Sequence, residues 1–442
     1  MLFSNRDLRL LILPLMIEQL LNALMGTIDT IMVSNVGSAA ISAVSLTDSI
    51  NNLMLQVFAA LATGGTIVCS QYLGKKEPEE CRRAAQQVFL TMFVISAAIT
   101  VLCILFRHPL LRVIFGQVET DVMEASQIYF LVTALSYPFI ALFNANAAFF
   151  RAEGNSRLPM TVSVICNLVN VAGNAILIFG LNLGVFGAAL ATLAARILMA
   201  VVMLWFQRQD RQIIVIRNYA KIRPQMALIA VILSVGIPSG IENGMFQFGK
   251  LAIQSTVSTL GTTAIAAQAM TIILENLNGI AAFGVGIGLM TVVGQCIGAG
   301  EKEQAVYYVK KLTMAAEIVV VVGCLLLFVF TRPITRIAGM EPASADMCFS
   351  MMCWITLVKP IVWTMAFIPG YGLRAAGDVR FSMIVSTASM WIFRVTLCIY
   401  LCRVQGFGPI AVWIGMFADW TVRAIIFWKR FRSRRWLEHR VV

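Results

Sequence analysis

Residues 16 to 34 read MIEQLLNALMGTIDTIMVS, and this stretch decides the class of fold. Together with the apolar residues before it, the stretch is long enough to cross the hydrocarbon core of a bilayer as one helix. It nevertheless contains Glu18, Asn22 and Asp29. Carboxylates are costly inside a membrane and are usually kept for function or for a buried partner. The stretch therefore predicts a membrane helix with a functional polar face.

Similar apolar runs recur along the whole chain, which is 59% hydrophobic and 13% charged. We expect twelve membrane-spanning helices, at residues 10–34, 40–72, 84–106, 126–150, 158–180, 185–206, 227–257, 263–296, 306–330, 346–370, 380–403 and 407–428. Such long runs exclude a transmembrane barrel, whose strands have about ten residues of alternating polarity. The predicted fold class is an all-α polytopic membrane protein.

The net charge of +12 follows from membrane topology. If the N-terminus is cytoplasmic, 24 of the 34 Lys and Arg residues lie in cytoplasmic segments and only five lie on the other side. This asymmetry is the positive-inside rule and predicts that both termini are cytoplasmic in a multi-pass protein of the cell membrane. It also removes the argument for a nucleic-acid partner.

The chain contains one motif twice. At an offset of 224 positions, residues 14–79 match residues 238–303 without gaps at 18 of 66 positions, including Glu18 with Glu242. Each half then holds six spans, so the halves are parallel repeats, an arrangement that is typical of carriers with a binding site between the halves. We expect an N-lobe at 1–206, a cytoplasmic linker at 207–224, a C-lobe at 225–428 and a basic cytoplasmic tail at 429–442.

Polar residues inside the spans are the candidates for the transport site. On a helix, Glu18 and Asp29 fall within about 20° of each other, and Asn22 lies on the same stripe. Lys250 is left open, either as the structural counter-ion of Glu242 or Glu275 or as part of a cavity. The candidates for lining a substrate cavity are Glu18, Asn22, Asp48, Asn52, Gln56, Glu242, Asn243, Gln247, Lys250 and Glu275.

Two further pairs of motifs carry a family resemblance. The segments IDTIMVSNVGSAAISAVS and SQYLGKKE, their second copy ending in GQCIGAGEKE, and the paired RAEGN and LRAAGD loops resemble the multidrug and toxic-compound extrusion (MATE) family over essentially the whole chain. The resemblance implies two six-helix lobes about a pseudo-twofold axis along the membrane normal. It also implies export of amphipathic, often cationic molecules by alternating access, driven by inward flow of H⁺ or Na⁺.

The resemblance also implies roles for individual residues. Asp29 stands at the family's first-helix aspartate, which couples cations, and Asn170 stands at the fifth-helix asparagine that assists it. Asn174 occupies a position where many members have a second Asp. Glu18, Asn170 and Asn174 join Asp29 as cation-coupling candidates, and Glu242 matches a seventh-helix glutamate that binds cations in one branch. In residues 347–370, where that branch has a further acid, this chain has only Lys359.

We therefore predict a secondary active multidrug antiporter that is not an enzyme. There is no P-loop motif for ATP. No cofactor is expected besides the coupling ion, no metal beyond Na⁺ at Asp29, and the protein is expected to be a monomer in contact with lipid and small-molecule substrates. A lipid-linked saccharide flippase of the same superfamily, a major-facilitator carrier and a pore or receptor remain alternatives.

Overall fold

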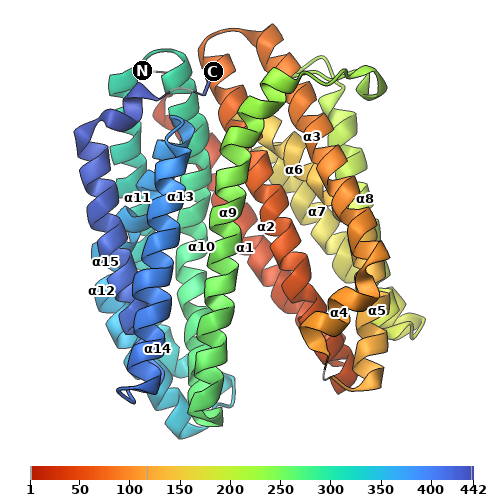
Figure 1. The fold of residues 1–442 in the computed structure, drawn as a ribbon, viewed down its shortest axis with the longest axis vertical. Coiled ribbons are helices and arrows are strands. Elements are labelled where there is room, and N and C mark those ends of the chain that lie inside the picture. The colour runs from red at the N-terminus through yellow and green to blue at the C-terminus, as the bar shows by residue number, and fades with distance from the viewer. Residues whose placement is uncertain (1, 117, 440) are drawn as a thin grey trace. The chain divides into compact units, whose positions relative to one another are not determined.

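The computed structural model describes residues 2–116, 118–439 and 441–442, and in this part of the chain helices joined by connecting segments form the whole of the regular structure. Twelve helical segments in this part of the chain are long and apolar enough to cross a membrane (Figure 1). Their number agrees with the twelve apolar runs, and the predicted fold class is confirmed.

Two compact units make up the structure, and their borders lie inside helices. One unit, here the N-terminal unit, is Leu20–Gly240, and the other, the C-terminal unit, combines the residues up to Gln19 with Ile241–Val442. The borders therefore cut through α1 (Asn5–Ser34) and α9 (Met226–Val257). Each of these helices has a proline near its border, Pro14 and Pro238.

The N-terminal unit contains the second part of α1 and the first part of α9. Between them lie α2 (Ser38–Gly74), α3 (Pro78–Leu105), α4 (Arg107–Phe115), α5 (Thr120–Leu135), α6 (Tyr137–Ala152), α7 (Arg157–Asn174), the π-helix η1 (Ala175–Gly180), α8 (Gly184–Gln207) and the short 3₁₀-helix η2 (Tyr219–Lys221).

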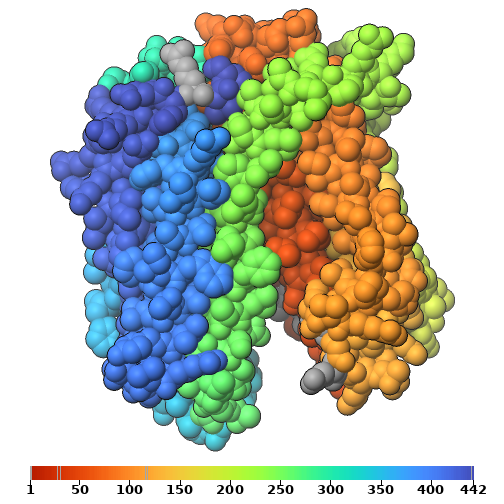
Figure 2. All heavy atoms as spheres, viewed as in Figure 1, coloured from red at the N-terminus to blue at the C-terminus, as the bar shows by residue number. Residues whose placement is uncertain are grey.

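The C-terminal unit contains the first part of α1 and the rest of α9. It continues with the 3₁₀-helix η3 (Ser258–Leu260), α10 (Thr262–Gly298), α11 (Lys302–Ile337), α12 (Pro342–Ala375), α13 (Val379–Ser389), the π-helix η4 (Met390–Val395), α14 (Thr396–Arg403), α15 (Ile410–Ser433) and the 3₁₀-helix η5 (Arg435–Glu438). In Figure 2 the blue segment of η4 and α14 lies along the second part of the green α9, from Ile241 onward. A Cβ atom at Gly249 of α9 would collide with Met390 of η4, so the two helices are in close contact.

Matched glycines of the two repeats let helices approach closely. A Cβ at Gly64 of α2 would lie 2.9 Å from the Ile232 carbonyl oxygen of α9, and a Cβ at Gly288 of α10 would lie 3.0 Å from Ile12 of α1. Each contact joins the second helix of one repeat to the first part of the first helix of the other. The borders of the units follow from this packing, which sequence proximity alone does not predict.

Several helices depart from the predicted spans. The run expected at 126–150 forms two helices that meet at Ser136. Pro138 stands in the first turn of α6 and lacks the backbone N–H that a continuous helix would need for its hydrogen bond to the preceding turn. The helix α4 was not expected. Within two other spans, η1 and η4 widen the helix locally, a feature that often marks functional positions.

Residues 208–225, between α8 and α9, are held against the N-terminal unit. The Ile214 N–H donates to Oε1 of Glu153 over 2.7 Å, and Arg82 Nε donates to the Ile213 carbonyl over 2.9 Å. The side chains of Ile214 and Ile216 are fully buried. This segment is therefore a packed part of the unit and not a loose connection.

Candidate functional site

Asp29 of α1 is held by amide side chains of α7. Asn174 Nδ2 donates to Asp29 Oδ1 over 2.9 Å, and Asn170 lies one turn before Asn174. With its amide turned over, Asn170 also donates to Asp29 Oδ1, over 2.9 Å, while its oxygen accepts from Thr192 of α8. The structure thus brings together Asp29, Asn170 and Asn174, three of the four residues predicted to couple cations. The fourth, Glu18, is buried in the other compact unit.

Asp48 of α2 belongs to a second polar cluster in the N-terminal unit. Its Oδ1 accepts from Tyr129 Oη over 3.2 Å and from Asn51 Nδ2 over 3.1 Å. Asn51 in turn accepts from Tyr137 Oη over 2.7 Å. Arg196 of α8 donates to Ser136 Oγ over 2.7 Å at the junction of α5 and α6. The tyrosines, the serine and the arginine were not among the predicted site residues, because their helical periodicity does not distinguish them from core side chains.

The other predicted residues of the first two helices have more varied surroundings. Asn22 Oδ1 accepts from Ser163 Oγ over 3.1 Å and from Asn167 Nδ2 over 2.9 Å, so it links α1 to α7. Asn52 is exposed and Gln56 is half-buried on α2. Asn22 therefore has a helix-packing contact of the kind common to amides in membrane helices.

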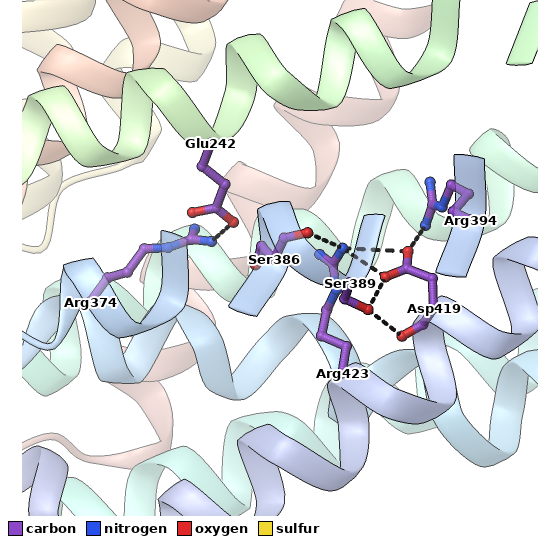
Figure 3. A network of polar contacts seen from close by, with 7 residues as sticks. All are labelled: Glu242, Arg374, Ser386, Ser389, Arg394, Asp419 and Arg423. Atoms are coloured by element: carbon purple, nitrogen blue, oxygen red, sulfur yellow. Dashed lines mark hydrogen bonds and ion pairs between the residues drawn. The ribbon is translucent and has the colours of Figure 1, made fainter. Parts of the chain in front are cut away.

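Two carboxylates of the C-terminal unit are each bound to a basic residue of α12. Glu242 Oε1 lies 2.6 Å from Arg374 Nη2 (Figure 3), and Glu275 Oε1 lies 2.6 Å from the fully buried Nζ of Lys359. The suggestion that Lys250 neutralises Glu242 or Glu275 is therefore wrong. Both acids find their partners on α12, which lies far away in sequence and is brought close only by folding.

Asp419 of α15 is the centre of a buried network, shown in Figure 3. Its carboxylate lies 3.0 Å from Nη2 of Arg423, which stands four residues further along the same helix. It also lies 2.5 Å from Arg394 Nη2 of η4 and accepts from Ser389 Oγ over 2.5 Å. Arg394 was missed as a site residue, although a lone arginine in an apolar span is itself a signal of function.

Lys250 instead borders a cavity of about 480 Å³ in the C-terminal unit. The cavity lies among α9, α10, η4 and α15, and its polar lining includes Lys250, Gln268, Glu275 and Arg394. Asn243 and Gln247, which were predicted to line a substrate cavity, are half-buried on α9 and do not line this one. The C-terminal unit thus offers a cavity with basic groups at its wall, whereas the N-terminal unit offers an acid held by amides.

Comparisons with known proteins agree with the repeat and with the helical architecture. The MatE family model matches residues 14–176 and 238–400, so its two matches start 224 residues apart. The chain is 29% identical to the uncharacterized transporter YisQ of Bacillus subtilis, over 96% of this chain and 93% of that protein. It is 27% identical to the probable multidrug resistance protein NorM of Thermotoga maritima, over 99% and 94%.

Solved structures of the same architecture resemble it along nearly the whole chain. One is the outward-facing conformation of a multidrug resistance MATE family transporter, with a TM-score of 0.88, 20% identity and coverage of 97% and 95%. Another is a MATE in complex with MaL6, with a TM-score of 0.87, 20% identity and 98% coverage of both chains. With a family model that matches both halves, this multi-pass membrane protein belongs to the multidrug and toxic-compound extrusion (MATE) family of efflux transporters and is not an enzyme.

Proposed function

We propose that the protein exports amphipathic small molecules by alternating access, in exchange for H⁺ or Na⁺ that binds at Asp29. The observation that supports this proposal is the Asp29 carboxylate inside a membrane helix, bound to Asn174 over 2.9 Å and adjacent to Asn170. Amide groups orient a carboxylate without cancelling its charge. Asp29 can therefore exchange a cation, whereas an acid fixed in an ion pair, such as Glu242, cannot do so without breaking that pair.

Neutralisation of Asp29 would connect the ion gradient to drug export. A proton or Na⁺ that enters from outside removes the charge in the N-terminal unit and changes the relative free energies of the two conformations. Coupling between two ligands is reciprocal, so the bound substrate weakens cation binding by the same factor. Asn174 stands beside Asp29 and donates a hydrogen bond to it, whereas an aspartate at position 174 would add a second negative charge. In this proposal the Asp29 carboxylate therefore carries the coupling by itself.

The test is transport in proteoliposomes under separately imposed pH and sodium gradients. Ethidium serves as a cationic probe and 1-naphthaleneacetate as an anionic probe. We expect one gradient to drive movement of at least one probe, and Asp29→Asn to abolish gradient-driven transport while the protein still folds and inserts. Asp346→Asn is the matched control, because Asp346 is an exposed acid whose carboxylate binds Arg332 near the end of α11. Normal gradient-driven transport by Asp29→Asn would overturn the assignment.

A further inference from the structure

The cavity beside Lys250 is rich in hydrogen-bond donors without partners. Among the described residues, no carboxylate lies within ion-pair distance of Lys250 Nζ, which instead lies 5.0 Å from the centre of the Phe246 ring. Nε of Arg394 and Nε2 of Gln268 are buried and have no hydrogen-bond partner. Buried donors without partners are costly, so a site that keeps two of them beside the ammonium of the more exposed Lys250 is suited to an acceptor from outside the chain.

The two carboxylates around this cavity are already bound by basic residues. Glu275 is bound by Lys359, and Asp419, which lies behind Arg394, is bound by Arg394, Arg423 and Ser389. In this region, four cations, Lys250, Lys359, Arg394 and Arg423, therefore face two carboxylates. The surplus of positive charge is at the cavity wall, because Lys250, Arg394 and Glu275 line the cavity, whereas Lys359 and Arg423 do not.

Two of the cations share one aromatic ring. The guanidinium of Arg394 lies 5.1 Å from the centre of the Phe246 ring, and Lys250 Nζ lies 5.0 Å from it. The ring attracts each cation but cannot neutralise both. Like charges held near one ring repel each other, and an anion that contacts both would reduce the repulsion.

The rest of the cavity is apolar and aromatic. Ile253 and Val257 of α9, Ile272 of α10, and Trp413 and Met416 of α15 line it. Trp413 Nε1 donates to Gln268 Oε1 over 2.9 Å, which orients the Gln268 amide with its NH₂ free. A pocket of this size with an apolar wall and a few converging polar groups is typical of sites for small organic ligands.

We propose that this cavity binds amphipathic organic anions, with the acidic group of the ligand at Lys250, Arg394 and Gln268 and its apolar body against Trp413 and Ile272. The proposal rests on the proposed export function and names a substrate class for it. It differs from the expectation of cationic substrates, because Glu242 and Glu275, the acids expected to meet a cation in this half of the chain, are both occupied by basic residues of α12.

The experiment measures binding without any gradient, by isothermal titration calorimetry of the full-length protein in phosphatidylcholine nanodiscs. The probes are 1-naphthaleneacetate and 1-naphthylmethylammonium, which share an aromatic body and have opposite charge, and empty nanodiscs give the blank. We expect the acetate to bind and the ammonium to bind at least about tenfold more weakly, because the cavity wall carries surplus positive charge.

The variant Lys250→Gln tests the residue most directly. Within the described part of the chain Lys250 forms no ion pair, so its removal leaves the buried networks intact. We expect the naphthaleneacetate affinity to fall by about tenfold through loss of a charged hydrogen-bond donor. Lys302→Gln is the matched control, because it removes the same charge from the exposed start of α11. The affinity of this variant for naphthaleneacetate should stay within about twofold of the wild type. Thermal unfolding of both variants checks that each is folded.

The outcomes of these measurements separate the anion site from the proposed export function. Equal binding of the two probes, or an unchanged affinity in Lys250→Gln, would overturn the proposal. Naphthaleneacetate binding is also measured in phosphatidylglycerol nanodiscs. Weaker binding there, by an amount that Lys250→Gln abolishes, would support the anion site and identify a lipid headgroup as a competing occupant. If binding follows the expectation but neither gradient drives transport, the proposed function fails while the anion site stands.

Discussion

At the residue scale, the buried ion pair of Lys359 and Glu275 shows how a membrane protein keeps charge inside its spans. Lys359 Nζ lies 2.6 Å from Glu275 Oε1 and also donates to the Glu275 carbonyl over 3.0 Å. Two interactions with the same residue compensate for the loss of water around the ammonium group. The pair joins α10 to α12, and its Glu275 lines the cavity beside Lys250.

Removal of only one partner should be far more harmful than removal of both. We expect Lys359→Met to destabilise the protein by about 3 kcal/mol, because Glu275 is left buried and uncompensated. The double variant Lys359→Met/Glu275→Gln should recover most of that loss. Thermal unfolding in detergent measures both, and a double variant no more stable than Lys359→Met would show that the charge pair is not the cause.

Asp29 and Glu242 illustrate how similar acids acquire different roles. The repeat places Glu242 at the position of Glu18, but it places Ile253 at the position of Asp29. In the structure Glu242 is bound by a guanidinium, whereas Asp29 is bound by neutral amides. An acid with neutral partners keeps a charge that a mobile cation can cancel. This difference could not be predicted from helical periodicity, because the partners come from other helices.

At the element scale, the packing of α1 against α10 depends on a glycine. A Cβ at Gly284 would lie 2.7 Å from both the N and Cα atoms of Met16, so an alanine there meets backbone that cannot move aside easily. Gly284 belongs to the motif GVGIG, residues 284–288, whose last glycine, Gly288, also lies close to α1.

We expect Gly284→Ala to lower the free energy of unfolding by about 1–3 kcal/mol through overpacking. Gly244→Ala of α9 is the matched control, since nothing lies within 4 Å of its Cβ position, and it should be neutral or slightly stabilising because alanine favours a helix. Thermal unfolding of the two variants side by side tests this. Equal effects would mean that the α1–α10 contact is not tight.

Glu153 connects α6 to residues 208–225 and gives this attachment a pH dependence. Burial raises the pKa of Glu153 to about 7, and the backbone N–H groups of Ile214 and Ile213 and the nearby Arg82 offset only part of that effect. The unfolded value is near 4.5. The attached state therefore binds the proton more tightly than the detached state, so attachment is strongest below pH 4.5 and weakens as the pH rises to about 7.

Hydrogen exchange at residues 208–218, corrected for the intrinsic rate at each pH, measures the attachment. We expect protection at pH 8 to be about thirtyfold lower than at pH 5.5, since pH 5.5 lies about 1.5 pH units below the raised pKa and each unit corresponds to a factor of ten in the equilibrium. Glu153→Gln keeps an acceptor for the Ile214 N–H but does not ionise, so its protection should not change with pH. A wild type without any such change would contradict a titrating Glu153.

At the scale of the whole molecule, the two repeats do not coincide with the two compact units. The repeats begin at Pro14 and Pro238, yet the contacts divide α1 after Gln19 and α9 after Gly240. The first part of each of these helices packs in the unit built mainly from the other repeat, through Gly64 and Gly288. Parallel repeats that exchange part of a helix are held together by side-chain packing as well as by the connecting residues 208–225.

The sequence by itself determined the twelve spans, the internal repeat, the family and the choice of Asp29, because hydrophobic length and motif spacing are written along the chain. Tertiary structure alone decided which charges are cancelled. Glu242 and Glu275 are bound by Arg374 and Lys359 from α12, while Lys250 is left facing a cavity. Ion pairing depends on atoms within a few ångströms of each other, and only the packed helices bring residues about a hundred positions apart to that distance.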